Sequence, residues 1–383
     1  MFDTTSNLIS RLLRDTITVL DIPPELREAA TREYLRVGEW LSAHADGASG
    51  WTVYPQGSFL LGTVVLPFGS DEYDVDSVCL RQIDKAETTQ KQLKDEVGAV
   101  LDAYRVAHSH LADGPVAIWE RTRCWTFEYA SSLRFHLDEL PAIPNPEAGP
   151  TGILITDRNL REWQRSNPLA FAEWFKQRAA LEFLEKRIRL AEARQTAPQA
   201  IPESDVRTTL QQTVQVLKLH RNRHFADDLD SRPASVLVST LAAHAYQGEQ
   251  ELYDAVLNAV ERMPDHVEEG PHGYSVLNPV EPREDFADRW RDRPELARKF
   301  FGWLERLSED LREAGAVRGL DRVVGRLSES FGEGPVVKAA GQLGDEYRRT
   351  RERGALSFAG ATGLISTTGP TPVRNHDFYG EIS

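Results

Sequence analysis

Two aspartates separated by one residue stand in a stretch with strand character, EYDVDSVCLRQI, at residues 72–83. Side chains two residues apart in a strand point to the same face, so Asp74 and Asp76 share a face and Val75 points away. Two carboxylates on one face repel each other unless a cation lies between them, and Mg²⁺ prefers the oxygen ligands that this pair offers. The pair therefore predicts a metal site. The alternative interpretation is a solvated edge strand with alternating charge.

A third aspartate occurs in another strand-like stretch, RFHLDELPA. Alternation places Phe135 and Leu137 on one face of this strand, and His136 and Asp138 on the other. An aspartate in such a strand is costly to bury unless it is paired or bound to a metal. Three acids from neighbouring strands would hold two divalent ions, Mg²⁺ or alternatively Mn²⁺, which would bind a triphosphate and activate a hydroxyl for in-line attack. His136 is interpreted as a structural, hydrogen-bonding histidine.

A Gly-Ser pair precedes the acids, between a short strand and an apolar segment. Gly57 at such a turn allows backbone N–H groups to approach a phosphate closely, and the Ser58 hydroxyl adds a hydrogen-bond donor. The alternative interpretation of the pair is a plain turn. Next to the three acids, the pair indicates a site for a phosphorylated substrate.

The charge of the chain restricts its partners. Among 383 residues, 45 are Lys or Arg and 59 are Asp or Glu, so the formal charge is −14. We therefore expect no binding to long nucleic acid, although a small polyanion could bind through a metal ion and local cations. No apolar run predicts a membrane span, and the first residues do not resemble a secretory signal. Cys79 and Cys124 are isolated, so we expect a reducing cytoplasm and neither a disulfide framework nor a zinc site.

The first half of the chain alternates helical and strand patterns. Apolar residues recur at helical spacing in residues 4–45, and residues 88–106 also favour a helix. Residues 141–168 contain several prolines and glycines and are predicted to be rich in loops. The predicted strands cover residues 51–56, 72–83, 119–129 and 132–143.

The second half is predicted to be nearly all helix. Residues 170–195 have the pattern of one long, charged amphipathic helix. Further predicted helices cover residues 207–225, 233–246, 251–263, 285–315 and 337–354. The change of pattern predicts a core domain over residues 1–165 that includes the N-terminal helices, a helical domain over 166–353, and a flexible tail over 354–383.

The combination GSF…GT…DVD, followed by a single aspartate in FHLDELPA, resembles the nucleotidyltransferase fold of DNA polymerase beta, poly(A) polymerase and oligoadenylate synthase. Within this superfamily the chain is most similar to the bacterial CD-NTases, relatives of cyclic GMP–AMP synthase. Three further segments carry the resemblance, which extends over roughly residues 10–350: SNPLAFAEWF, LQQTVQVLKLHRNRHF with RPASVLVSTLAAHAY, and NPVEPREDFADRW.

The resemblance implies an α+β fold, in which a polymerase-beta-like domain with a mixed sheet is joined to a helical domain that closes the nucleotide cleft. It implies that Asp74, Asp76 and Asp138 are both the catalytic residues and the metal ligands. It also implies that Gly57 and Ser58 contact phosphate groups of the nucleotide.

The resemblance further implies that Lys218 and Ser235 of the helical domain contact the triphosphate. Without it, Lys218 would be interpreted as a surface lysine whose apolar stem lies along its helix, and Ser235 as a helix cap. Additional candidate phosphate-binding cations, each of which could instead simply face water, are Arg161, Arg165, Arg221 and Arg223.

By resemblance, the chain is expected to join NTPs, ATP among them, without a template and to close the product into a cyclic oligonucleotide messenger of bacterial anti-phage (CBASS) defence. A second hypothesis is a linear nucleotidyltransferase that acts on RNA, a protein or a small molecule. A third is an inactive binding or scaffold protein. The presence of all three acids favours an enzyme.

The composition of the C-terminal residues bears on whether the chain has a regulatory partner. Residues 354–373 are rich in glycine and small polar residues, whereas Phe378 and Tyr379 near the end are aromatic. Some CD-NTases have a mobile C-terminus that a regulatory protein recognises, and the resemblance implies such a partner here. The alternative is that the two aromatic side chains dock on the enzyme's own surface.

Overall fold

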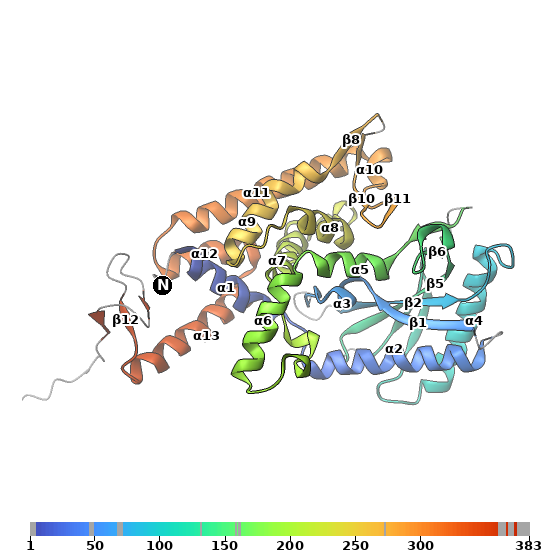
Figure 1. The fold of residues 1–383 in the computed structure, drawn as a ribbon, viewed down its shortest axis with the longest axis horizontal. Coiled ribbons are helices and arrows are strands. Elements are labelled where there is room, and N and C mark those ends of the chain that lie inside the picture. The colour runs from blue at the N-terminus through green and yellow to red at the C-terminus, as the bar shows by residue number, and fades with distance from the viewer. Residues whose placement is uncertain are drawn as a thin grey trace, which may run out of the picture.

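The computed structural model describes residues 5–45, 50–66, 72–130, 132–157, 159, 162–271, 273–358, 365–366 and 371–373. These residues form a mixed sheet flanked by helices and a second part built mainly of helices (Figure 1). The predicted α+β class is therefore confirmed. No helix within the described ranges is both long enough and apolar enough to cross a membrane.

The sheet carries its central strands in the order β1-β2-β5-β4-β3, with β6 and β7 added beyond β5. Strands β2 and β5 are parallel, and the other pairs are antiparallel. The strands of this sheet are β1 (Trp51–Gln56), β2 (Tyr73–Arg81), β3 (Ala117–Glu120), β4 (Trp125–Glu128), β5 (Phe135–Pro144), β6 (Ile153–Ile155) and β7 (Gln164–Ser166).

One prediction for this region was wrong. Residues 119–129 are not one strand, because the chain turns between β3 and β4 and the two strands pair with each other. Residues 141–168, predicted to be rich in loops, also contain β6 and β7, which are each three residues long and extend the sheet. Strands this short are stabilised by pairing with their neighbours, which a local sequence pattern does not show.

Helices α2 (Pro24–His44) and α4 (Gln90–His108) cover one face of the sheet. The alternating residues Tyr73 and Val75 of β2 are buried in the core against these helices. The same alternation turns Asp74 and Asp76 to the opposite face, where α3 (Gly57–Leu61) and α5 (Pro168–Gln177) lie (Figure 1). The face of the sheet that carries the acids, called the open face below, is therefore the one opposite α2 and α4.

The second part is built around α7 (Thr209–His224), which is buried along most of its length. The region predicted as one helix over residues 170–195 is two helices, since the chain breaks between α5 and α6 at residues 178–179. Two hairpins, β8–β9 and β10–β11, also occur in this part. The remaining elements are α6 (Ala180–Ala193), α8 (Ser235–Ala245), α9 (Leu252–Arg262), β8 (Glu268–Gly270), β9 (Gly273–Ser275), β10 (Leu277–Asn278), β11 (Glu281–Asp285), α10 (Arg289–Asp292), α11 (Pro294–Ala316), α12 (Leu320–Phe331) and α13 (Glu333–Glu352), together with short 3₁₀ turns.

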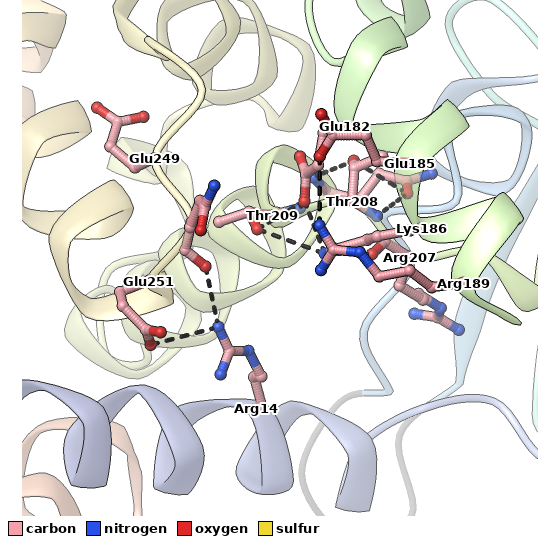
Figure 2. A network of polar contacts seen from close by, with 12 residues as sticks. Arg14, Glu182, Glu185, Lys186, Arg189, Arg207, Thr208, Thr209, Glu249 and Glu251 are labelled. Atoms are coloured by element: carbon pink, nitrogen blue, oxygen red, sulfur yellow. Dashed lines mark hydrogen bonds and ion pairs between the residues drawn. The ribbon is translucent and has the colours of Figure 1, made fainter. Parts of the chain in front are cut away.

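Helix α1 (Thr5–Val19) belongs to this helical part, although the sequence analysis placed it with the sheet. It packs among α7, α9 and α13, away from the sheet (Figure 1). Its apolar face joins the helical core, and the Arg14 guanidinium lies 3.2 Å from the Gln250 carbonyl and 3.6 Å from the Glu251 carboxylate (Figure 2). The amphipathic pattern predicts that α1 buries one face but does not indicate which partner covers it.

Truncation of α1's buried face should destabilise the protein. Leu12 is fully buried in the helical core, so Leu12→Ala should lower the free energy of unfolding by about 2–5 kcal/mol through lost burial and a residual cavity. Chemical denaturation measures this change. Leu35→Ala on α2, where the side chain is 51% exposed, is the control and should change stability by no more than about 0.5 kcal/mol. Equal effects of the two substitutions would contradict the placement of α1.

The N-terminus of α7 is fixed by a polar network (Figure 2). The Glu182 carboxylate of α6 accepts hydrogen bonds of 2.7 Å from both the backbone N–H and the hydroxyl of Thr209, and Lys186 lies 2.6 Å from the same carboxylate. Thr208 forms a capping box with Gln211. Because α7 reaches the open face of the sheet, this network sets the position of the side chains that α7 contributes there.

The predicted flexible tail is partly ordered. Its described residues include β12 (Ser357–Phe358), β13 (Ile365–Ser366) and β14 (Thr371–Pro372), which form a small antiparallel sheet. The prediction of no secondary structure was therefore wrong at these positions. Phe378 and Tyr379 lie outside the described residues.

Candidate active site

The three predicted acids lie on adjacent strands and face one cavity. Asp76 of β2 is opposite Asp138 of β5 in the parallel register, and Gln56 of β1 is opposite Asp76 on the other side. Asp74 lies two residues before Asp76 on the same face. All three carboxylates line a cavity of about 1490 Å³ between the sheet and the helical part. The structure thus brings together the acids that the sequence analysis singled out.

The electrostatics of these acids show a cluster of negative charge that the nearby cations offset only in part. Burial, followed by the carboxylates of Asp138 and Asp74, raises the pKa of Asp76 to about 7. Burial and the Asp138 carboxylate also raise the pKa of Asp74. Among the described residues, no three acid, histidine or cysteine side chains already have the spacing of a metal cage. The carboxylates therefore repel one another in a shared cavity, and a cation between them would relieve the repulsion.

Two polar contacts are made by side chains of β5, one by Asp138 and one by His136. The Thr126 hydroxyl of β4 donates a 2.6 Å hydrogen bond to Asp138 Oδ1. His136 Nε2 lies 2.8 Å from the Glu72 carboxylate, which agrees with the predicted structural role of this histidine. Thr126 is a site residue that the sequence analysis missed, because one threonine in a strand gives no local signal.

Gly57 and Ser58 form the first turn of α3, directly after β1. Gly57 has φ +61°, and a Cβ atom at this position would lie 2.4 Å from Asp76 Oδ2. Both the backbone conformation and the close approach of Asp76 therefore require glycine. Ser58 lines the same cavity, so the Gly-Ser pair and the acids face a common space.

Lys218 is buried rather than exposed on the surface of its helix. Its side chain is in the cavity wall with 5% exposure, and Nζ donates to the carbonyl (3.1 Å) and hydroxyl (3.2 Å) of Thr63. Burial, followed by the nearby Arg221, lowers the pKa of Lys218 to about 7, whereas the Asp76 carboxylate opposes this shift. The interpretation as a surface lysine is thus wrong, and the ammonium group lies close to Asp76.

Lys218 is one of three polar side chains on one face of α7 that bind the end of α3 and the residues after it. Gln211 Nε2 donates to the Leu61 carbonyl (2.9 Å), and Gln215 Nε2 donates to the Val64 carbonyl (2.8 Å). These two glutamines were missed, although spacings of four and then three residues up to Lys218 put all three side chains on one helix face. The helical part therefore holds the turn that carries Gly57 and Ser58.

Ser235 lies in the first turn of α8 and does not cap the helix. Its hydroxyl accepts a 3.0 Å hydrogen bond from Arg221, a guanidinium that is only 5% exposed. Burial and the nearby Arg232 lower the pKa of Arg221 to about 9. Arg221 and Ser235 both line the cavity, so this wall offers cationic and hydroxyl donors.

Of the other arginines predicted to bind phosphate, two line the cavity and one lies outside the described residues. Arg165 lines the cavity and pairs with Glu147 at 2.7 Å. Arg223 also lines it and donates to the Glu329 carbonyl at 3.0 Å. Arg161 lies outside the described residues. The basic side chains around the acids thus come from both parts of the molecule.

Replacement of Lys218 should weaken nucleotide binding. Lys218→Ala removes an ammonium group that interacts electrostatically with Asp76, and we expect NTP affinity to fall by about 1.5–3 kcal/mol, as for loss of a hydrogen bond to a charged group. Titration calorimetry with NTP measures the change. Lys176→Ala is the matched control, because Lys176 pairs with Glu203 on the surface of α5. Unchanged binding and turnover in Lys218→Ala would remove this residue from the site.

With this geometry in place, comparison with known proteins identifies the class. No family model matches the chain. The structure superimposes on CdnG of Bradyrhizobium diazoefficiens, solved in complex with GTP, with a TM-score of 0.71, 22% identity and coverage of 88% of this chain and 99% of that one. CdnC of E. coli MS115-1, solved with HORMA-deltaN, superimposes with a TM-score of 0.60, 12% identity and coverage of 84% and 96%. The chain thus has the same fold as these two proteins, the first of which is a CD-NTase.

Sequence relatives extend this result. The chain is 27% identical to c-di-GMP synthase of Roseivirga ehrenbergii, with 91% of each protein aligned. It is 26% identical to the cyclic dinucleotide synthase CdnG of B. diazoefficiens, over 97% of this chain and 95% of that protein. Over more than nine-tenths of its length the chain is thus similar to proteins named as cyclic dinucleotide synthases, and CdnG among them is a CD-NTase, the family that the motifs resemble.

Proposed function

We propose that the chain is an Mg²⁺-dependent nucleotidyltransferase that joins NTPs and closes the product into a cyclic dinucleotide. One observation carries the proposal: Asp74, Asp76 and Asp138 face the cavity into which Ser58 and Lys218 also project. The relatives named as cyclic dinucleotide synthases, aligned over nearly their whole length, support cyclisation rather than transfer to another acceptor.

The residues present fit a divalent cation. The donors are carboxylate oxygens, which Mg²⁺ and Mn²⁺ prefer, and the raised pKa of Asp76 reflects negative charge that a cation would neutralise. In this proposal Asp74, Asp76 and Asp138 hold the metal. When bound, it would neutralise triphosphate charge and lower the pKa of the attacking hydroxyl.

The reaction would proceed twice by the same displacement. The hydroxyl oxygen of one nucleotide attacks the α-phosphorus of another and gives up its proton to a carboxylate of the cavity. A new P–O bond forms, the P–O bond between the α-phosphorus and the bridging oxygen breaks, and pyrophosphate leaves with the electrons of that bond. Thr126 would orient Asp138, and the turn at Gly57 and Ser58 would hold phosphate oxygens opposite the acids. Lys218 and Arg221 would offset negative charge from the helical side.

The test is product analysis. The purified protein is incubated with Mg²⁺ and a mixture of all four NTPs, treated with phosphatase and examined by mass spectrometry. A phosphatase-resistant cyclic product, absent from the Asp74→Asn/Asp76→Asn double variant, is expected. Phosphatase-sensitive linear products, or a labelled acceptor, would indicate the linear nucleotidyltransferase, and the absence of any product would indicate a scaffold.

We further propose that the product is a messenger in anti-phage defence and that the enzyme works in the cytoplasm, where its free cysteines Cys79 and Cys124 would stay reduced. A regulatory protein partner is also part of this proposal. The structural relative CdnC has been solved with HORMA-deltaN, which supports a protein partner. Whether residues 370–383 mediate that contact can be tested by deletion: purified activity should persist while signalling in cells is lost.

A further inference from the structure

Glu284 lines the cavity but is not one of the three acids proposed to hold the metal. Glu284 lies on β11 of the helical part, in the β10–β11 hairpin next to β7. Its half-buried carboxylate lines the same cavity. Asn278 Nδ2 donates a 2.6 Å hydrogen bond to Oε2, and the Ser166 side chain also hydrogen-bonds to Glu284. These contacts fix the orientation of a carboxylate on the cavity wall.

The arginines around Glu284 are paired with other acids. Arg123 pairs with Asp157 at 3.1 Å, Arg283 with Glu281 at 3.0 Å, and Arg291 with Asp285 at 2.9 Å. No ion pair within the described ranges includes Glu284, and burial raises its pKa to about 7. An acid held in place without an ion-pair partner can accept hydrogen bonds from a ligand.

The free acceptor positions of the Glu284 carboxylate restrict the kinds of ligand that it can bind. An ionised carboxylate has about four acceptor positions, and Asn278 and Ser166 use two of them. The remaining positions suit a planar group with two adjacent N–H donors. Guanine presents such a pair at N1 and the 2-amino group, whereas adenine presents an acceptor at N1, which would oppose the carboxylate.

The position of Glu284 in the cavity suits a base whose phosphates lie at the acids. Strand β11, which carries Glu284, contacts β7, and β6 connects β7 to β5, the strand of Asp138. Phe286, two residues after Glu284, also lines the cavity and packs edge-on against Phe171 with a centroid distance of 5.9 Å. An apolar ring next to an oriented carboxylate provides both a packing surface and an edge contact for a base.

We propose that Glu284 determines base specificity by accepting hydrogen bonds from N1–H and the 2-amino group of a guanine nucleotide. The proposal rests on the nucleotidyltransferase function proposed above and adds the base to it. Asn278 and Ser166 act as positioning residues that hold the carboxylate toward the cavity.

The experiment compares GTP, ITP and ATP with the wild-type protein and with Glu284→Gln, at pH 8.5 so that the carboxylate is ionised. ITP differs from GTP only in lacking the 2-amino group. The wild type should favour GTP over ITP and over ATP in kcat/KM, by about 10-fold or more for a bidentate contact. Glu284→Gln should reduce both ratios to within about threefold, because an amide replaces one acceptor with a donor.

Glu281→Gln is the matched control, since Glu281 lies in the same hairpin but pairs with Arg283 and does not line the cavity. It should keep the wild-type base preference. If Glu284→Gln does not fold, Glu284→Asp replaces it and should reduce the GTP/ITP ratio, because the shorter side chain withdraws the carboxylate from the base. A wild-type protein without GTP preference, or a ratio unchanged by substitution of Glu284, would overturn the proposal.

Product formation tests the proposed function, and nucleotide binding tests the role of Glu284 separately. If the wild type forms no product from any NTP, the proposed function fails, and calorimetric binding of GTP and ITP then decides the role of Glu284. Tighter binding of GTP than of ITP, lost in Glu284→Gln, would support the inference. Equal binding of the two nucleotides would overturn it.

Discussion

Asp76→Asn is expected to reduce product formation at least about 1000-fold, because the metal that would supply several kcal/mol of transition-state stabilisation loses a ligand. The same substitution should stabilise the metal-free protein. Burial and two neighbouring carboxylates oppose ionisation of Asp76, so removal of its charge relieves a cost of about 1–3 kcal/mol. An activity assay and thermal unfolding in EDTA measure the two effects.

The pH dependence of this stabilisation has a definite sign. The folded pKa of Asp76 is about 7, above its ordinary value of 3.8, so the folded state binds more protons between these values and loses stability as pH rises. Asp76→Asn should therefore exceed the wild type in melting temperature at pH 8, and the difference should vanish near pH 4. Added Mg²⁺ should stabilise the wild type at pH 8 more than the variant.

Asp84→Asn is the control, because Asp84 lies in the turn after β2 and bonds the backbone of Ala86. It should leave turnover and the pH dependence of stability unchanged. Near-full turnover in the Asp74→Asn/Asp76→Asn double variant would show that the active site is elsewhere.

Gly57→Ala should also abolish most activity, for a different reason. A Cβ atom at this position would lie 2.4 Å from Asp76 Oδ2, so either the turn or the carboxylate must move. Displacement of a reacting group by about 1 Å can cost about 100-fold in rate, and we expect at least this loss in kcat/KM. Strain at φ +61° should lower stability by a further 1–3 kcal/mol or so.

Gly149→Ala separates these two effects. Gly149 has φ +82°, but a Cβ atom there would meet nothing within 4 Å. It should lose about 1–2 kcal/mol of stability from backbone strain and keep its turnover. If Gly57→Ala resembled Gly149→Ala in both measurements, close approach to Asp76 would have no functional role.

The acids could be predicted from sequence because their arrangement depends on short-range alternation. Once residues 72–83 and 132–143 are strands, the two-residue period places Asp74, Asp76 and Asp138 on defined faces. The motif resemblance added the pairing of the two strands, which alternation alone does not specify.

Other site residues depend on long-range packing, which local patterns do not encode. Gln211 and Gln215 have the appearance of polar helix residues that face water, yet they bond carbonyl groups about 150 positions earlier in the chain. Glu284 belongs to a hairpin that lies largely between two predicted helices, in a half of the chain for which no strand was predicted. Helix α1 was assigned to the wrong domain because an amphipathic pattern shows which face of a helix is buried but does not show what covers that face.

The position of α1 has a consequence for the order in which the chain becomes structured during synthesis. The sheet part, from α2 to β7, is an insertion between α1 and the other helices of the helical core. Its principal partner α13 begins at Glu333, whereas α1 ends at Val19, so α1 leaves the ribosome long before α13 is made. Domains generally fold as units during translation, so the inserted sheet part can fold first. Until the helical part is complete, the apolar face formed by Ile9, Leu12 and Leu13 stays exposed, where it can aggregate or bind a chaperone.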